Sequence, residues 1–121
     1  MAKVFEKKPF ISDVLKWEVD YKYTREKLEI TASGADVDVT CGETYTDEGA
    51  KVTDATFDCI VLENRVIPAG ETHEILVLKR GPAIVDPENM STGLAADALS
   101  ARLEELNILT VRPSKVFYQE T

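Results

Sequence analysis

Three short apolar runs, each bounded by glycine or proline, constrain the fold of this chain more than any other feature. They cover residues 59–62, 75–78 and 83–85. Runs of this length between Gly and Pro are typical of buried strands joined by turns, and none reaches the ~10–12 residues expected of a buried helix. We expect these three strands to form the core on which the rest of the chain packs.

Residues 16–24 alternate strictly between polar and apolar side chains. Trp17, Val19, Tyr21 and Tyr23 fall on one face of this alternation. A period of two with aromatic and β-branched residues predicts a half-buried strand. Two interpretations stay open: an ordinary strand of the domain, or a strand or arm whose apolar face is covered by another chain.

Weaker patterns predict the remaining elements. Further strands are expected over residues 25–32, 37–39 and 108–112, with turns between them, which suggests a compact β-barrel or sandwich. Apolar residues at helical spacing predict one helix over about residues 93–106, capped by Ser91 or Thr92 and followed by Asn107 in the left-handed conformation.

Composition and charge exclude several classes of function. The 121 residues fit a single domain, and the net charge of −8 argues against binding to nucleic acid or to an anionic membrane surface. No secretion signal or membrane span is visible, so we expect a reducing, cytosolic environment and two free thiols. Residues 1–27 nevertheless carry seven basic and five acidic groups, against seven and 17 in the remainder. Because residues 1–15 show no regular period, we expect them to form an arm of opposite charge to the body.

The sequence offers no active site. His73 is the only histidine, no nucleophile is marked beside it, and Cys41 and Cys59 are too few and too far apart for a zinc site. A hard-cation site around Asp36, Asp38, Glu43, Asp47 and Glu48 is conceivable, but a solvated acidic loop is the simpler interpretation. We therefore expect no catalytic, cofactor-binding or metal-binding residues, and a binding or structural role becomes the default.

The order of segments resembles the head decoration proteins of tailed bacteriophages, the lambda-type capsid-stabilising family. Residues 23–34 resemble the family's S-R-E-x-V-T-I-A-S-G stretch, residues 37–45 its short strands with a glycine between them, and residues 54–62 its D-A-x-x-x-G-I-L segment. Residues 80–85 match its R-G-x-A-x-V stretch, and residues 103–112 its L-x-x-L-G-I-x-V-R ending. The resemblance covers about residues 17–112. Cys59 and Asn107 stand where the family usually has glycine.

The resemblance implies a fold class that is mainly β: a small barrel-like or β-clip-type domain with one C-terminal α-helix and an extended N-terminal arm. Residues 1–24 would be the capsid-binding arm and first strand, residues 25–112 the decoration-protein β domain, and residues 113–121 a C-terminal tail. The expected capsid-binding residues are Phe5, Phe10, Ile11, Val14, Trp17, Val19, Tyr21 and Tyr23.

The function that the resemblance implies is that of a non-enzymatic cement protein. Such a protein is made in the host cytoplasm and joins the virion, where it binds the outer surface of the expanded phage head as a homotrimer at three-fold and quasi-three-fold sites. Its partners are the major capsid protein and its own copies, and it stabilises the head against internal DNA pressure. The alternative is a small cytosolic β-domain ligand-binding or adaptor protein. An enzyme using Cys59 or carboxylate chemistry is a third hypothesis.

Overall fold

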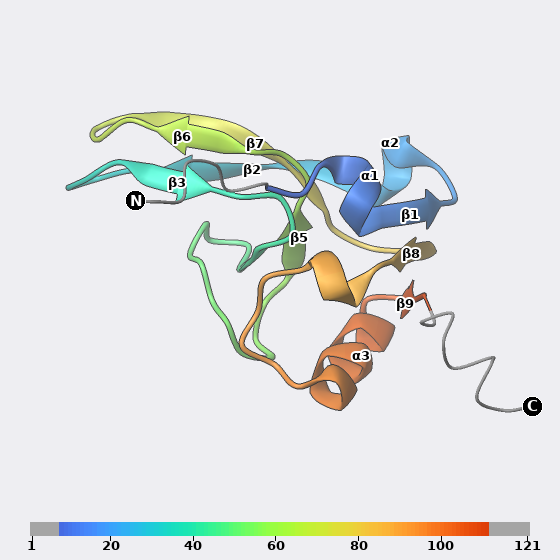
Figure 1. Ribbon diagram of the computed structural model, residues 1–121. Coiled ribbons are helices and arrows are strands. Elements are labelled where there is room, and N and C mark those ends of the chain that lie inside the picture. Colours follow the sequence, from blue (N-terminus) through green and yellow to red (C-terminus); the bar gives the residue numbers. More distant parts are fainter. Residues whose placement is uncertain (1–7, 112–121) are drawn as a thin grey trace, which may run out of the picture.

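The computed structural model describes residues 8–111, and Figure 1 shows how their helices and strands are arranged. The strands are β1 Leu15–Glu18, β2 Arg25–Thr31, β3 Val37–Val39, β4 Thr44–Tyr45, β5 Cys59–Val61, β6 Arg65–Ile67, β7 Thr72–Leu78, β8 Ala83–Val85 and β9 Ile108–Thr110. The helical elements are α1 Ile11–Val14, α2 Tyr21–Thr24, the 3-10 turn η1 Pro87–Asn89 and α3 Ala96–Glu105. The protein is mainly β, as the sequence predicted.

Within residues 8–111 the strands form three sheets that do not close into a barrel. One sheet has the strand order β1-β8-β9, the second β2-β7-β5-β4, and the third pairs β3 with β6. The pairs are antiparallel except for β8 and β9, which run parallel. In Figure 1 the strands β2, β3, β6 and β7 extend to the left, whereas β1, β8, β9 and α3 lie to the right.

The apolar runs predicted as core strands are continuous because both faces of β5 and β7 are buried. The hydrophobic cluster on one face contains Cys59, Val61, Ile75 and Val77, and the cluster on the other contains Ile60, Leu62, Leu78 and the partly buried Leu76. A strand covered on both faces has no solvent-facing position, so the alternation with polar residues is lost. The prediction that these runs form the core is confirmed.

The predicted C-terminal helix is present as α3, which is shorter than the expected range of residues 93–106. Leu99 and Leu103 are buried in the same cluster as β8 and β9, so the helix packs against the β1-β8-β9 sheet and its neighbours. Asn107 follows with φ 65°, which confirms the predicted left-handed residue after the helix.

The predicted helix cap is wrong. The residue at the N-cap of α3 is Ala95, which makes no side-chain cap. Thr92 instead accepts a hydrogen bond from Leu94 N through Oγ1 at 3.1 Å. The Thr92 hydroxyl therefore stabilises the connection before the helix instead of the helix end. Such short local turns compete with helix capping for the same side chain.

The N-terminal region departs from two predictions. The strand expected over residues 16–24 ends at Glu18, and a bend leads into α2. Asp20 is the physical reason, because its carboxylate accepts a hydrogen bond from Lys22 N at 3.0 Å and caps the helical turn. The arm expected over residues 1–15 contains a second helical turn, α1, which Asp13 closes by accepting from Phe10 N at 2.8 Å.

Residues 11–24 belong to the same packed body as the rest of the domain. Val14 is completely buried, and Leu15 pairs with Val85 where β1 joins β8. The boundary predicted between an arm of residues 1–24 and a domain of residues 25–112 therefore does not separate two packed units. Phe5 and the tail of residues 113–121 lie outside the described residues.

Candidate binding surface

Large apolar side chains gather on the surface beside β1 and α2. Seven are exposed among residues 8–111, and four of these are Trp17, Val19, Tyr21 and Tyr23, with 51, 52, 60 and 55 % of their surface accessible. We call these four residues the apolar ridge. Scattered exposed hydrophobic residues are normal, but four large apolar side chains exposed within seven residues of one segment make that segment a candidate interaction site.

Glu18 and Thr24 lie on the inner side of the segment that carries the ridge. Glu18 accepts hydrogen bonds from Arg25 Nε at 3.1 Å on each carboxylate oxygen, from Arg25 Nη2, and from the hydroxyl of the buried Thr24. Burial raises the pKa of Glu18, but the hydrogen bonds from Arg25 and Thr24 and the charge of Arg25 outweigh it, so the pKa lies below its ordinary value. This network ties the end of β1 to the start of β2.

Two arginines hold the aromatic rings of α2. The guanidinium carbon of Arg25 lies 5.7 Å from the centre of the Tyr21 ring, and that of Arg80 lies 5.1 Å from the centre of the Tyr23 ring. Arg80 also donates to the carbonyl of Tyr23 and forms an ion pair with Glu26. Cation–π contacts of this kind contribute about 0.5–1 kcal/mol at exposed sites. These contacts hold the rings of Tyr21 and Tyr23 against the body before any partner binds.

The predicted capsid-binding residues fall into three groups in the structure. The ridge residues are exposed together, and Phe10 is exposed on its own at 63 %. Ile11 packs against the core and Val14 lies inside it, so these two side chains support the fold. Phe5 lies outside the described residues.

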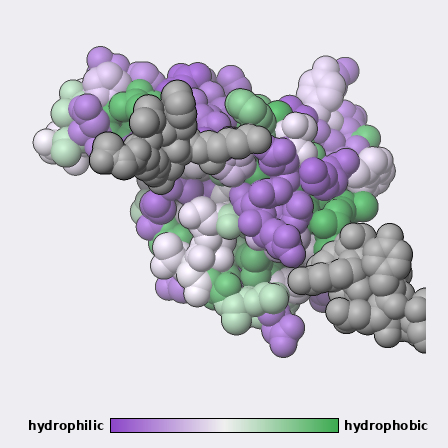
Figure 2. Space-filling model, viewed as in Figure 1, coloured by the Kyte–Doolittle hydropathy of each residue, from purple (hydrophilic) through white to green (hydrophobic). Residues whose placement is uncertain are grey.

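Leu109 and the partly buried Ile84 extend this apolar surface, and no pattern in the sequence marked either as a surface residue. Trp17 is the register partner of Ile84, and Ile84 that of Leu109, so the three side chains form a row across β1, β8 and β9. Leu109 is 57 % exposed. In Figure 2 hydrophobic residues, in green, gather at the right, where Figure 1 places β8 and β9. Strands of three residues are too short for an alternation to reveal which residue faces outward.

A groove lies at the opposite edge of this sheet from β1. Its lining consists of Ser100 and Glu104 from α3 and of Ile108, Leu109 and Thr110 from β9, and its volume is about 280 Å³. We call it the α3–β9 groove. One edge of the β1-β8-β9 sheet thus carries the apolar ridge and the other carries a groove with an acidic side chain.

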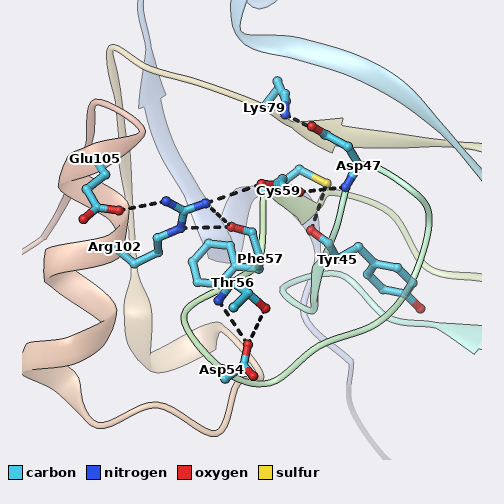
Figure 3. A network of polar contacts seen from close by, with 10 residues as sticks. Tyr45, Asp47, Asp54, Thr56, Phe57, Cys59, Lys79, Arg102 and Glu105 are labelled. Atoms are coloured by element: carbon cyan, nitrogen blue, oxygen red, sulfur yellow. Dashed lines mark hydrogen bonds and ion pairs between the residues drawn. The ribbon is translucent and has the colours of Figure 1, made fainter.

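Arg102 fixes α3, and with it one wall of the groove. Figure 3 shows its guanidinium between the helix and the loop that precedes β5. Arg102 donates to the carbonyl of Phe57 from Nε at 3.0 Å and from Nη2 at 2.6 Å, and it pairs with Glu105 at 2.8 Å and with Asp58 at 3.4 Å. The arginine therefore joins two segments that lie 45 residues apart in the sequence.

The residues considered for chemistry do not gather in the described part of the chain. His73, on β7, lies with Nε2 2.8 Å from Oε1 of Glu71, whereas Cys59 lies on β5 and Cys41 in the turn that follows β3. Burial raises the pKa of Cys59 to about 12, and burial together with the charge of Asp13 raises that of Cys41 to about 11. Both are buried free thiols, as predicted, and a thiol with so high a pKa is a poor nucleophile at neutral pH.

Over residues 8–111, no group of three or more His, Cys, Asp or Glu side chains could hold a metal ion, including the acidic residues considered in the sequence.

Comparison with protein-family models, with curated proteins and with solved structures found no match for this chain. Among the described helices, none has the length and apolar character needed to cross a membrane.

Proposed function

We propose that this protein is a non-enzymatic capsid decoration protein. It binds the outer surface of the expanded head of a tailed phage as a homotrimer, at three-fold and quasi-three-fold sites, and stabilises the shell against internal DNA pressure. The observation that carries the proposal is the apolar ridge, because a rigid group of exposed aromatic side chains fits a protein partner better than a small-molecule substrate.

The positions of four of the five segments that resemble the decoration family also support the proposal. Residues 25–31 form β2, residues 59–61 form β5 and residues 83–85 form β8. Asn107, where the family has glycine, adopts the left-handed conformation that favours glycine. The residues that carry the resemblance therefore occupy structural positions for which their amino-acid types are suited.

The shell contact is proposed for the segment that precedes α1. Ile11 and Val14 belong to the core, which leaves Phe10 and the residues before it for the major capsid protein. Residues 3, 7 and 8 are lysines, and the shell segment therefore has the opposite charge to the acidic body. An extended segment can add to the edge of a partner's sheet, where main-chain hydrogen bonds supply affinity, and three copies on one trimer act together.

The test is a pair of truncations. Deleting residues 1–7 leaves all described residues in place, so the variant is expected to keep the fold and oligomeric state of the full chain while no longer protecting expanded capsids from heat or chelators. Deleting residues 1–15 also removes Val14 and Leu15 from the core and is expected to destabilise the body. Unchanged capsid affinity after the shorter deletion would place the shell contact on the body. A wild-type chain that stays monomeric would favour the ligand-binding or adaptor alternative.

A further inference from the structure

The two edges of the β1-β8-β9 sheet differ in shape. The edge at β1 carries the apolar ridge, which projects, and the edge at β9 carries the α3–β9 groove, which is hollow. In Figure 1 α2 lies above β1 and α3 lies below β9, so the ridge and the groove are at opposite ends of the same sheet. A surface that projects at one end and is hollow at the other can join copies of itself in series.

The two edges also differ in charge. Lys16, Lys22 and Asp20 are exposed in the segment that carries the ridge, where they sum to a charge of +1, whereas Asp97 and Glu104 are exposed on α3. Contact between two ridges would bring lysines together, whereas contact between a ridge and a groove would place the lysines of one copy near the carboxylates of the next.

The apolar area agrees with an interface between proteins. An aromatic side chain buries ~150–250 Å² when fully covered, so the half-exposed ridge offers roughly 300–400 Å². This is about half of the ~800 Å² that each partner contributes to a standard interface. The row formed by Trp17, Ile84 and Leu109 continues the apolar surface toward the groove. The groove, at about 280 Å³, exceeds the ~150 Å³ cavity that accepts a benzene ring.

We infer that copies of this chain associate head to tail, with the apolar ridge of one copy seated on the α3–β9 groove of the next. Such a contact is heterologous, since the two surfaces differ, and repeated contacts generate a ring when the rotation between copies closes and an open filament when it does not. The inference rests on the proposed function, in which the ring has three members, and it assigns the surfaces that hold the trimer together. The segment before α1 then remains available to the shell.

Three substitutions test the contact in the free protein, without capsids. Tyr21→Asp places a charge on the ridge, Leu109→Asp places one beside the groove, and Val66→Asp is the control, because Val66 is equally exposed at 54 % on β6 in a different sheet. Sedimentation velocity is expected to show a dissociation constant at least about tenfold higher for the first two variants, as for interface hot spots, and no change for the control. Glu104→Lys is a second groove variant if Leu109→Asp does not fold.

Mixing the two variants separates a head-to-tail contact from a symmetric one. The Tyr21 variant keeps an intact groove and the Leu109 variant an intact ridge, so an equimolar mixture is expected to form one-to-one pairs, although neither variant associates alone. Trp17 is the only tryptophan, and its emission is expected to move to longer wavelength as the wild-type protein is diluted and the ridge becomes exposed to water. Added salt is expected to weaken the association, because it screens exposed charges.

The inference is overturned if the wild-type chain is monomeric, if neither variant changes the dissociation constant, or if the mixture yields no pairs. Capsid protection is measured separately on the wild-type chain. Loss of capsid binding by a chain that still assembles would reject the proposed function and leave the head-to-tail contact standing. Assembly through another surface, with capsid binding retained, would reject the head-to-tail contact and leave the proposed function standing.

Discussion

Replacing Arg102 by methionine tests the packing of α3 most directly. Methionine keeps most of the aliphatic length but removes the two donors that satisfy the carbonyl of Phe57, whose side chain is completely buried. An acceptor left without a partner costs about 1–3 kcal/mol, the exposed pair with Glu105 contributes about 0.2–0.5 kcal/mol, and the cation–π contact about 0.5–1 kcal/mol. We expect a loss of about 2–3 kcal/mol in the free energy of unfolding.

Urea unfolding followed by circular dichroism, at one fixed protein concentration, measures this loss. With a slope of about 1–3 kcal/mol/M, the midpoint is expected to fall by about 0.7–3 M. Arg102→Lys retains one donor and is expected to lose about half as much, while Glu105→Gln isolates the exposed pair and is expected to lose less than about 0.5 kcal/mol. A methionine variant within about 0.5 kcal/mol of wild type would refute the argument, because changes that small are typical of surface positions without special contacts.

Three further predictions concern the core, the thiols and the effect of pH. Leu103→Ala is expected to cost about 2–5 kcal/mol, measured by the same unfolding assay, and an effect below about 0.5 kcal/mol would mean that this helix face is not in the core. Cys41 and Cys59, whose pKa values are raised to about 11 and about 12, are expected to resist alkylation in the native state at neutral pH. Both are expected to react in denaturant without reductant, and failure to react would indicate a disulfide. Because the pKa of Glu18 is lowered from 4.5, its stabilising effect is present above about pH 4.5 and lost as pH falls through the lower folded value, so the advantage of wild type over Glu18→Gln is expected to shrink under acid unfolding.

The core strands could be predicted because their signal does not depend on partners far away in the chain. The runs at residues 59–62 and 75–78 are apolar at every position, and a strand needs this only when both of its faces are covered. The buried position of Leu99 and Leu103 followed from helical spacing in the same way. Asn107 was predictable because few residues other than glycine adopt positive φ.

The groove and the third sheet could not be predicted. β6 carries Arg65, Val66 and Ile67, of which only the last is buried, so three residues give no period to detect. Leu109 lines a surface that exists only because α3 ends beside β9, and its role depends on that packing. The role of Arg102 could not be predicted either. Its partner Phe57 is distant in the sequence, and the spacing of charges on the helix does not identify that partner.

Residues 16–24 were misread because the strand stops at Glu18 and residues 21–24 form the helical turn α2, where an alternation of period two does not place side chains on one face. In an ordinary half-buried strand the apolar residues would face the core, whereas here Thr24 is buried and Glu18 partly so, and the ridge faces solvent. Glu18 and Thr24 can lie on the inner side because Glu18, Thr24 and Arg25 satisfy one another's hydrogen bonds, which removes most of the cost of burying them. No comparable compensation exists for four exposed apolar side chains in water. Residues 15–18 are an ordinary strand of the domain, and the covering of the ridge by another chain stays a proposal, for which the two tyrosines already held by arginines would lower the cost in ordering entropy.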